Sequence, residues 1–135
     1  MSTPWWLMIR EPDLIGDLFG GATPPLTGFA LAELRWEHET KRLELRGTLS
    51  TFPSIRRPDW EKDANRMGIR LVFEDVQSYD LKGWDLEAPI DLEVLHQQEE
   101  NTLRVRGQNE ALSFEVVCDG VDVTEIFAYH SPALN

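Results

Sequence analysis

The chain of 135 residues contains one cysteine and no hydrophobic run long enough to cross a membrane. Cys118 therefore has no partner for an internal disulfide. The five-residue apolar run 5–9 falls far short of the about 20 residues that a membrane helix needs. No basic segment precedes that run as it would in a secretory signal. We therefore expect a cytoplasmic protein without a disulfide or a membrane anchor.

Positive charge is also scarce, with 13 basic residues against 24 acidic ones and a formal net charge of −11. The excess lies in two blocks, because residues 59–93 hold ten acids against four bases and residues 107–135 hold five acids and no base. Nucleic acid binding needs Lys and Arg at the phosphates, so this charge argues against it. A basic protein partner would be attracted at long range. The alternative is an acidic surface that only maintains solubility.

Motifs of the common catalytic and metal sites are missing. The chain has no Gly-x-Ser-x-Gly elbow, no phosphate-binding glycine loop and no His-Glu-x-x-His helix. The three histidines occupy separate segments without the spacing of metal ligands: His38, His96 and His130. Cys118 continues the apolar face of an alternating run, which predicts a buried residue and not a nucleophile. We expect no enzyme, no bound metal and no cofactor.

Short helical signals open the chain. Thr3-Pro4 resembles a helix start with proline in the first turn. A second helix is predicted from Asp13, because apolar residues recur on one stripe that ends at Phe19. Gly20-Gly21 would end this helix. The prediction is a helical lead-in over about residues 3–20.

From Gly28 the apolar period changes to two, which is typical of strands with one buried face. The first run places Trp36 on the apolar side, where we expect it in the core. Asp119-Gly120 indicates a hairpin turn between the last two runs. The alternating runs cover 30–36, 43–49, 69–73, 79–83, 90–94, 103–105, 112–118 and 121–127.

About eight short strands at regular spacing predict a mainly β (α+β) fold, an antiparallel sheet or sandwich with one or two short N-terminal helices. We expect one domain over residues 1–135, with its β-rich body at about 28–129.

Residues 51–84 interrupt this regular pattern. Proline cannot donate to a sheet ladder, so the stretch around Pro53, Pro58 and Trp60 must be a shaped loop. Long loops of this kind are often functional. Trp60 and Trp84 each lie among carboxylates, where they either anchor a loop by burial or contact a partner.

The motifs of this interrupted segment resemble the immunity protein 50 family of bacterial polymorphic-toxin systems. They are Phe52-Pro53, Pro58-x-Trp60, Asn65, the Ile-x-Leu-x-Phe strand at 69–73, and Leu81-x-Gly83-Trp84. The N-terminal run Ile15-Gly16-x-Leu18-Phe19-Gly20 and the pair Pro25-Leu26 are similar too. The resemblance extends from about Ile15 to Phe127. It implies a mostly β protein that acts inside the cell as an antidote by binding and neutralising a cognate toxin.

This resemblance suggests that the acidic block 59–93 faces the toxin. Many toxins of such systems attack nucleic acid and are basic, so the expected partner is a basic toxin domain such as a nuclease. We expect neither nucleic acid nor a membrane as a partner, and the choice between monomer and homodimer stays open. The candidate contacts are Asp59, Trp60, Glu61, Asp63, Asp75, Asp80, Trp84, Asp85 and Glu87.

Three other classes stay open. A carbohydrate- or small-ligand-binding β module would present Trp60 and Trp84 as exposed, coplanar rings. A β-sandwich hydrolase would need a cleft in which carboxylates or histidines of perturbed pKa converge. A structural subunit would pair its exposed edge strands in a homodimer.

Overall fold

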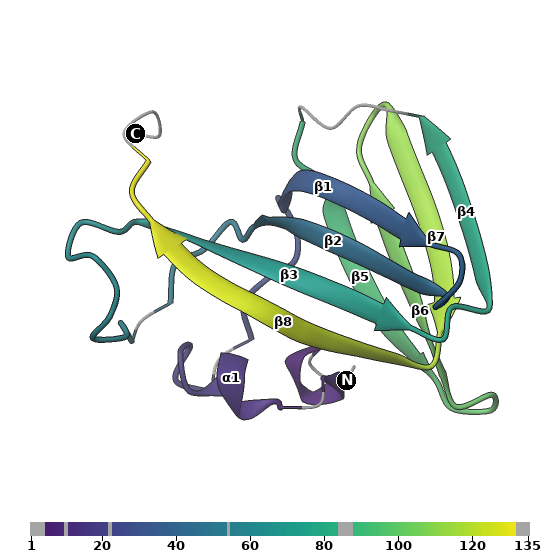
Figure 1. Cartoon of the computed structure of the whole chain (residues 1–135), viewed down its shortest axis with the longest axis horizontal. Helices are drawn as coiled ribbons and strands as arrows, with labels where there is room; N and C mark the ends of the chain where they lie inside the picture. The colour runs from purple at the N-terminus through teal and green to yellow at the C-terminus, as the bar shows by residue number, and fades with distance from the viewer. Residues whose placement is uncertain (1–4, 10, 22, 54, 84–87, 132–135) are drawn as a thin grey trace.

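The computed structural model describes residues 5–9, 11–21, 23–53, 55–83 and 88–131 (Figure 1). A 3-10 helix, η1 (Trp5–Met8), and a one-turn helix, α1 (Asp13–Gly16), precede eight strands. The strands are β1 (Ala30–Glu37), β2 (Arg42–Thr48), β3 (Arg66–Glu74), β4 (Ser78–Gly83), β5 (Asp91–Gln97), β6 (Thr102–Gln108), β7 (Leu112–Cys118) and β8 (Gly120–Tyr129). The mainly β class predicted from the alternating pattern is confirmed.

The strands form two four-stranded antiparallel sheets, ordered β1-β2-β3-β8 and β4-β7-β6-β5 (Figure 1). Two neighbouring chain segments pass from one sheet into the other, because β3 leads into β4 and β7 leads into β8. Backbone pairing continues through this bend: the Gln77 N–H donates to the Val117 carbonyl at 2.7 Å, and the Asp119 N–H donates to the Glu74 carbonyl at 3.0 Å. The two sheets therefore share a corner made of one bent ribbon.

The hairpin predicted at Asp119-Gly120 is wrong, because β7 and β8 lie in different sheets. The turn residues instead take the chain around the corner. A local turn signal reports a change of chain direction, but it does not say whether the two flanking strands pair with each other.

A second seam joins the sheets away from this corner. The N–H groups of Phe29 and Ile90 each donate to the other residue's carbonyl, at 2.8 and 2.9 Å. The Leu92 N–H donates to the Leu26 carbonyl at 3.0 Å. The start of β1 is thereby fixed to the start of β5, and the inner faces of the two sheets enclose a common core.

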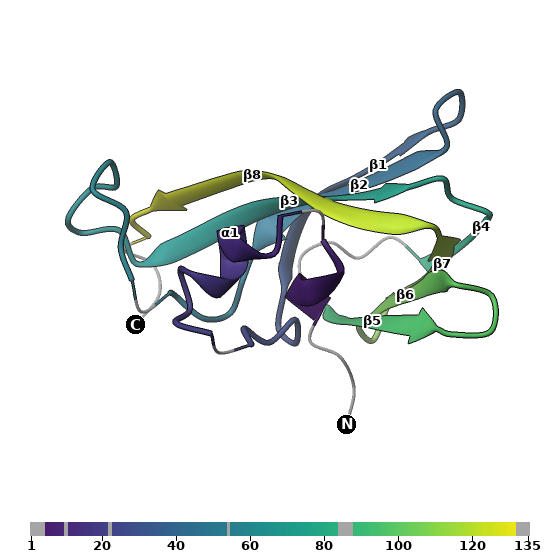
Figure 2. The same cartoon turned by 90° about the horizontal axis from the view of Figure 1, so that it is seen from below.

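The core collects the apolar positions of the alternating runs, as the period of two predicts. Phe29, Phe73 and Val105 are fully buried. The lead-in contributes Ile15, also fully buried, and Trp5, whose indole N–H donates to the Pro24 carbonyl at 2.9 Å. Figure 2 shows η1 and α1 lying against the part of the first sheet that contains β3 and β8.

The helices of the lead-in are shorter than predicted. The expected helix after Pro4 is a 3-10 turn, and Thr3 and Pro4 lie outside the described residues. The second helix ends at Gly16 and not at Phe19. Ordering the backbone of a single helical turn costs more free energy than its few hydrogen bonds contribute. Both segments therefore depend on packing of their apolar side chains against the sheet.

Trp36 is not a core residue, which corrects the prediction for β1. A bulge between Leu31 and Glu33 shifts the register against β2, so Leu31 is buried while its neighbour Ala32 is exposed. Beyond the bulge Trp36 pairs with Leu43 at the sheet edge. Its side chain is 36% exposed and its ring lies 5.4 Å from that of Tyr79. An edge strand has no neighbour to complete the burial.

Replacement of Gly47 by alanine should destabilise this core. A Cβ at Gly47 would collide with the Ala30 carbonyl oxygen and the Phe29 ring, and the backbone at Ala30 cannot move aside cheaply. We expect Gly47→Ala to lower the free energy of unfolding by about 2 kcal/mol, measured by urea titration. Gly120→Ala is the matched control, because a Cβ there meets no atom within 4 Å. Equal stability of the two variants would contradict the packing described.

Candidate functional site

The segment between β2 and β3, residues 49–65, is called the Pro-Trp loop here, and its described part is folded into tight turns. The Trp60 N–H donates to the Arg57 carbonyl at 3.1 Å, and the Ala64 N–H donates to the Glu61 carbonyl at 3.2 Å. Donation across three residues is the mark of a β-turn or a 3-10 turn. The described part of the loop therefore has a defined backbone conformation that its own hydrogen bonds hold.

Trp60 is a half-buried anchor of this loop. Its ring meets that of Phe52 edge-on, with centroids 5.8 Å apart, and both side chains pack against the core. The guanidinium of Arg56 lies 4.8 Å from the centre of the Phe52 ring, and that of Arg57 lies 6.0 Å from the centre of the Trp60 ring. Such contacts bury aromatic area and hold the loop against the body of the protein.

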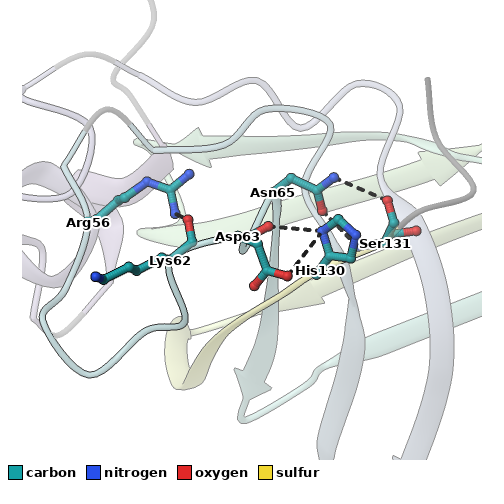
Figure 3. Close-up of polar contacts among 6 residues, drawn as sticks. All are labelled: Arg56, Lys62, Asp63, Asn65, His130 and Ser131. Atoms are coloured by element: carbon teal, nitrogen blue, oxygen red, sulfur yellow. Dashed lines mark hydrogen bonds and ion pairs between the residues drawn. The ribbon is translucent and has the colours of Figure 1, made fainter.

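The end of the loop is fastened to the segment that follows β8 (Figure 3). The Asn65 side-chain amide donates to the Ser131 carbonyl at 3.1 Å and accepts from the Ser131 N–H at 2.8 Å. His130 Nδ1 lies 3.0 Å from the Asp63 carbonyl oxygen, which can only accept, so this nitrogen carries the proton of that bond. These contacts join residues more than 60 positions apart, and sequence patterning provided no signal for Ser131 or His130.

Three candidate carboxylates project from the loop into solvent: Asp59, Glu61 and Asp63. Asp63 Oδ2 is 3.9 Å from His130 Nδ1, an exposed pair that contributes little to stability. The same loop also carries Arg56, Arg57 and Lys62, so its formal charge is zero. The loop is a mixed surface and is not a source of the negative excess.

The other candidates are not brought to this loop. Asp75 lies at the bend between β3 and β4, and Asp80 lies on β4 opposite Glu115. Figures 1 and 2 place β4 and the Pro-Trp loop at opposite ends of the molecule. Trp84, Asp85 and Glu87 lie outside the described residues. A block that is continuous in the sequence therefore divides into two separate groups in space.

The family described as Immunity protein 50 matches residues 11–129. The chain belongs to the immunity protein 50 family. The matched range includes α1, both sheets and the Pro-Trp loop, so the resemblance noted in the sequence is confirmed over most of the chain. Comparisons with curated proteins and with solved structures found no match.

In this member of the immunity protein 50 family, the possible metal ligands and the single thiol can be placed within the described residues. No cluster of three or more His, Cys, Asp or Glu residues there could hold a metal ion. Cys118 is fully buried, and burial raises the pKa of its thiol to about 12, although a backbone hydrogen bond at Gly120 opposes this shift. No helix among the described residues is long and apolar enough to span a membrane.

Removal of the Asn65 amide should loosen the loop. Asn65→Ala removes both hydrogen bonds to Ser131, so we expect a loss of about 2 kcal/mol in unfolding free energy and faster amide exchange over residues 57–65. Ser131→Ala is the control, because Ser131 makes these two bonds through its backbone. The fastening role is wrong if the two variants exchange at the same rate.

The Cys118 thiol should be unreactive in the folded protein. Its raised pKa leaves almost no thiolate at about pH 8, and burial blocks access for reagents. We expect labelling by Ellman's reagent to be complete in guanidinium and very slow in the native protein. Rapid native labelling would place Cys118 at the surface.

Proposed function

We propose that the chain binds a toxin domain made by its own cell and blocks it by covering part of its surface, without catalysis. The match of residues 11–129 to the immunity protein 50 family is the observation that supports this proposal most strongly. Inhibition by binding requires a complementary surface and no active site. We further propose that the protein acts in the cytoplasm, where it would meet the toxin before export.

We propose a basic toxin domain, such as a nuclease, as the partner. The formal net charge of −11 supports this choice, because opposite net charges raise the rate of encounter by steering. A toxin that binds nucleic acid carries basic side chains at its phosphate sites. Carboxylates of the inhibitor could occupy the same positions.

Of the two groups of candidate acids, the group on the Pro-Trp loop is the better contact surface. Asp59 and Glu61 are exposed on a loop whose backbone is held by Trp60 and Asn65. A surface that is already ordered loses less entropy when the partner binds. Asp75 and Asp80, at the other end of the molecule, are the second candidate surface.

The geometry of Trp60 gives the carbohydrate-binding alternative no support. Stacking on a sugar needs an exposed aromatic face. Trp60 is half-buried, edge-on to Phe52 and near the guanidinium of Arg57. Contacts within the loop therefore already occupy part of the Trp60 ring.

We expect the cognate toxin to be encoded beside the gene of this chain, and the function is tested by co-expression with that toxin domain. The wild-type chain should restore growth of cells that produce the toxin, and the two purified proteins should form a stable complex. Absence of both rescue and binding would refute the proposal. An immunity protein paired with a different toxin is the negative control.

The contact surface is tested by reversing two charges on the loop. Asp59→Lys with Glu61→Lys should lower the association rate constant for the toxin about tenfold, because an attractive surface becomes repulsive. Glu99→Lys with Glu100→Lys is the matched control, since it makes the same change of net charge in the exposed turn between β5 and β6. Equal effects of the two pairs would show that net charge matters and position does not.

A further inference from the structure

A groove of about 610 Å³ separates the α1 segment from the Pro-Trp loop. Its apolar lining comes from both sides: Pro12, Leu14 and Leu18 from the lead-in, and Ile55 and Pro58 from the loop. Ile55 is 52% exposed, the largest exposed fraction among the large apolar side chains in the described part of the chain. A single exposed apolar side chain is ordinary, but Ile55 lies with other apolar side chains along one groove, and such groups of apolar side chains often mark interaction sites.

The two rims of this groove, called the α1 groove below, have opposite formal charge. The lead-in supplies three exposed carboxylates: Glu11, Asp13 and Asp17. The loop supplies Arg56 and Arg57.

Both arginines of the loop rim contact other residues of the same loop. Arg56 donates to the Lys62 carbonyl at 3.2 Å and lies over Phe52, while Arg57 lies over the Trp60 ring. Among the described residues no ion pair crosses the groove. Both arginines keep their positive charge, but they are held on the loop side, so the groove has an acidic rim formed by α1 and a basic rim formed by the loop.

The shape of the α1 groove is set before any partner arrives. The Ile55 N–H donates to the Leu18 carbonyl at 3.1 Å, which ties the loop to the lead-in. The Asp17 N–H donates to the Asp13 carbonyl at 3.0 Å and closes the single turn of α1. Pro12 and Pro58 restrict the backbone on the two sides. A groove ordered in this way binds a partner at a low entropic cost.

We propose that the α1 groove receives a loop of the cognate toxin that carries a Lys or Arg beside an apolar side chain. The basic group would lie against Asp13 and Asp17, and the apolar side chain would pack on Ile55 and Leu14. Charge complementarity on the α1 side supports this occupant, because that rim supplies three exposed carboxylates and the partner proposed above is basic. This inference rests on the proposed function and adds a surface and a chemistry to it.

The α1 groove adjoins the exposed acids of the Pro-Trp loop, because Arg56, Arg57 and Pro58 precede Asp59 and Glu61 directly. The two features would form one contact area with different roles. The outer acids steer the encounter and mainly affect the association rate, whereas a seated side chain mainly affects the dissociation rate.

The test measures binding kinetics with the full-length chain and a catalytically inactive form of the toxin domain encoded beside its gene. Asp13→Lys with Asp17→Lys should raise the dissociation rate constant about tenfold or more. Ile55→Ser should raise it to a similar extent without a change of charge, and its exposed position makes unfolding no concern. Glu99→Lys with Glu100→Lys, the matched charge control, should leave the dissociation rate constant unchanged.

Each outcome decides the question. If the wild-type chain binds and both groove variants dissociate at the wild-type rate, the docking site is wrong and the proposed function stands. If the wild-type chain does not bind the toxin, both the docking site and the proposed function are refuted. If Ile55→Ser instead abolishes self-association of the free chain in sedimentation, the occupant is a second copy and the inference is overturned. Melting temperatures check that the Asp13 and Asp17 variant is folded, and Ile55→Ser decides the question if it is not.

Discussion

The bent ribbon of β3–β4 and β7–β8 is the constraint on which the rest of the structure depends. Because backbone pairing continues through the bend at Gln77 and Asp119, the two sheets are held at one corner with their apolar faces toward each other. The seam between Phe29 and Ile90 then encloses the core. The far parts of β3 and β8 extend past the second sheet, and the lead-in covers their apolar face (Figure 1). That cover brings α1 beside the Pro-Trp loop and so creates the α1 groove.

In this immunity protein 50 family member, the blocks of charge along the sequence do not correspond to patches of charge on the folded surface. The acidic block 107–135 is dispersed over both sheets. Within it Glu115 contacts Arg104 at 3.4 Å and Arg106 at 2.9 Å, and Glu125 contacts Arg70 at 3.3 Å. The Pro-Trp loop has no formal net charge, because Arg56, Arg57 and Lys62 balance its three acids. The net charge steers partners at long range, whereas a specific contact depends on which carboxylates remain unpaired at one place.

The fold was predictable where a local rule applies without competition. Alternation identified the strands, and the buried residues Leu43, Leu45 and Ile69 are those that the period of two predicts. The prediction failed at β1, where a bulge changed the phase and the sheet edge left Trp36 partly exposed. It failed again at Asp119, since a turn signal cannot distinguish a hairpin from a crossing between sheets. Register and strand partnership are long-range properties that no short window contains.

The amino-acid sequence alone settled the mainly β class, most of the core, the acidic balance and the family, because composition, period and motif are properties of adjacent residues. Only part of the candidate site could be predicted from the sequence. The sequence identified Asp59, Trp60 and Asn65, but the division of the acidic block, the fastening of Asn65 to Ser131 and the pairing of Ile55 with Leu18 came from the three-dimensional fold. These contacts join segments separated by dozens of residues. They form only when the two sheets and the lead-in pack together, and that packing depends on residues from the entire chain.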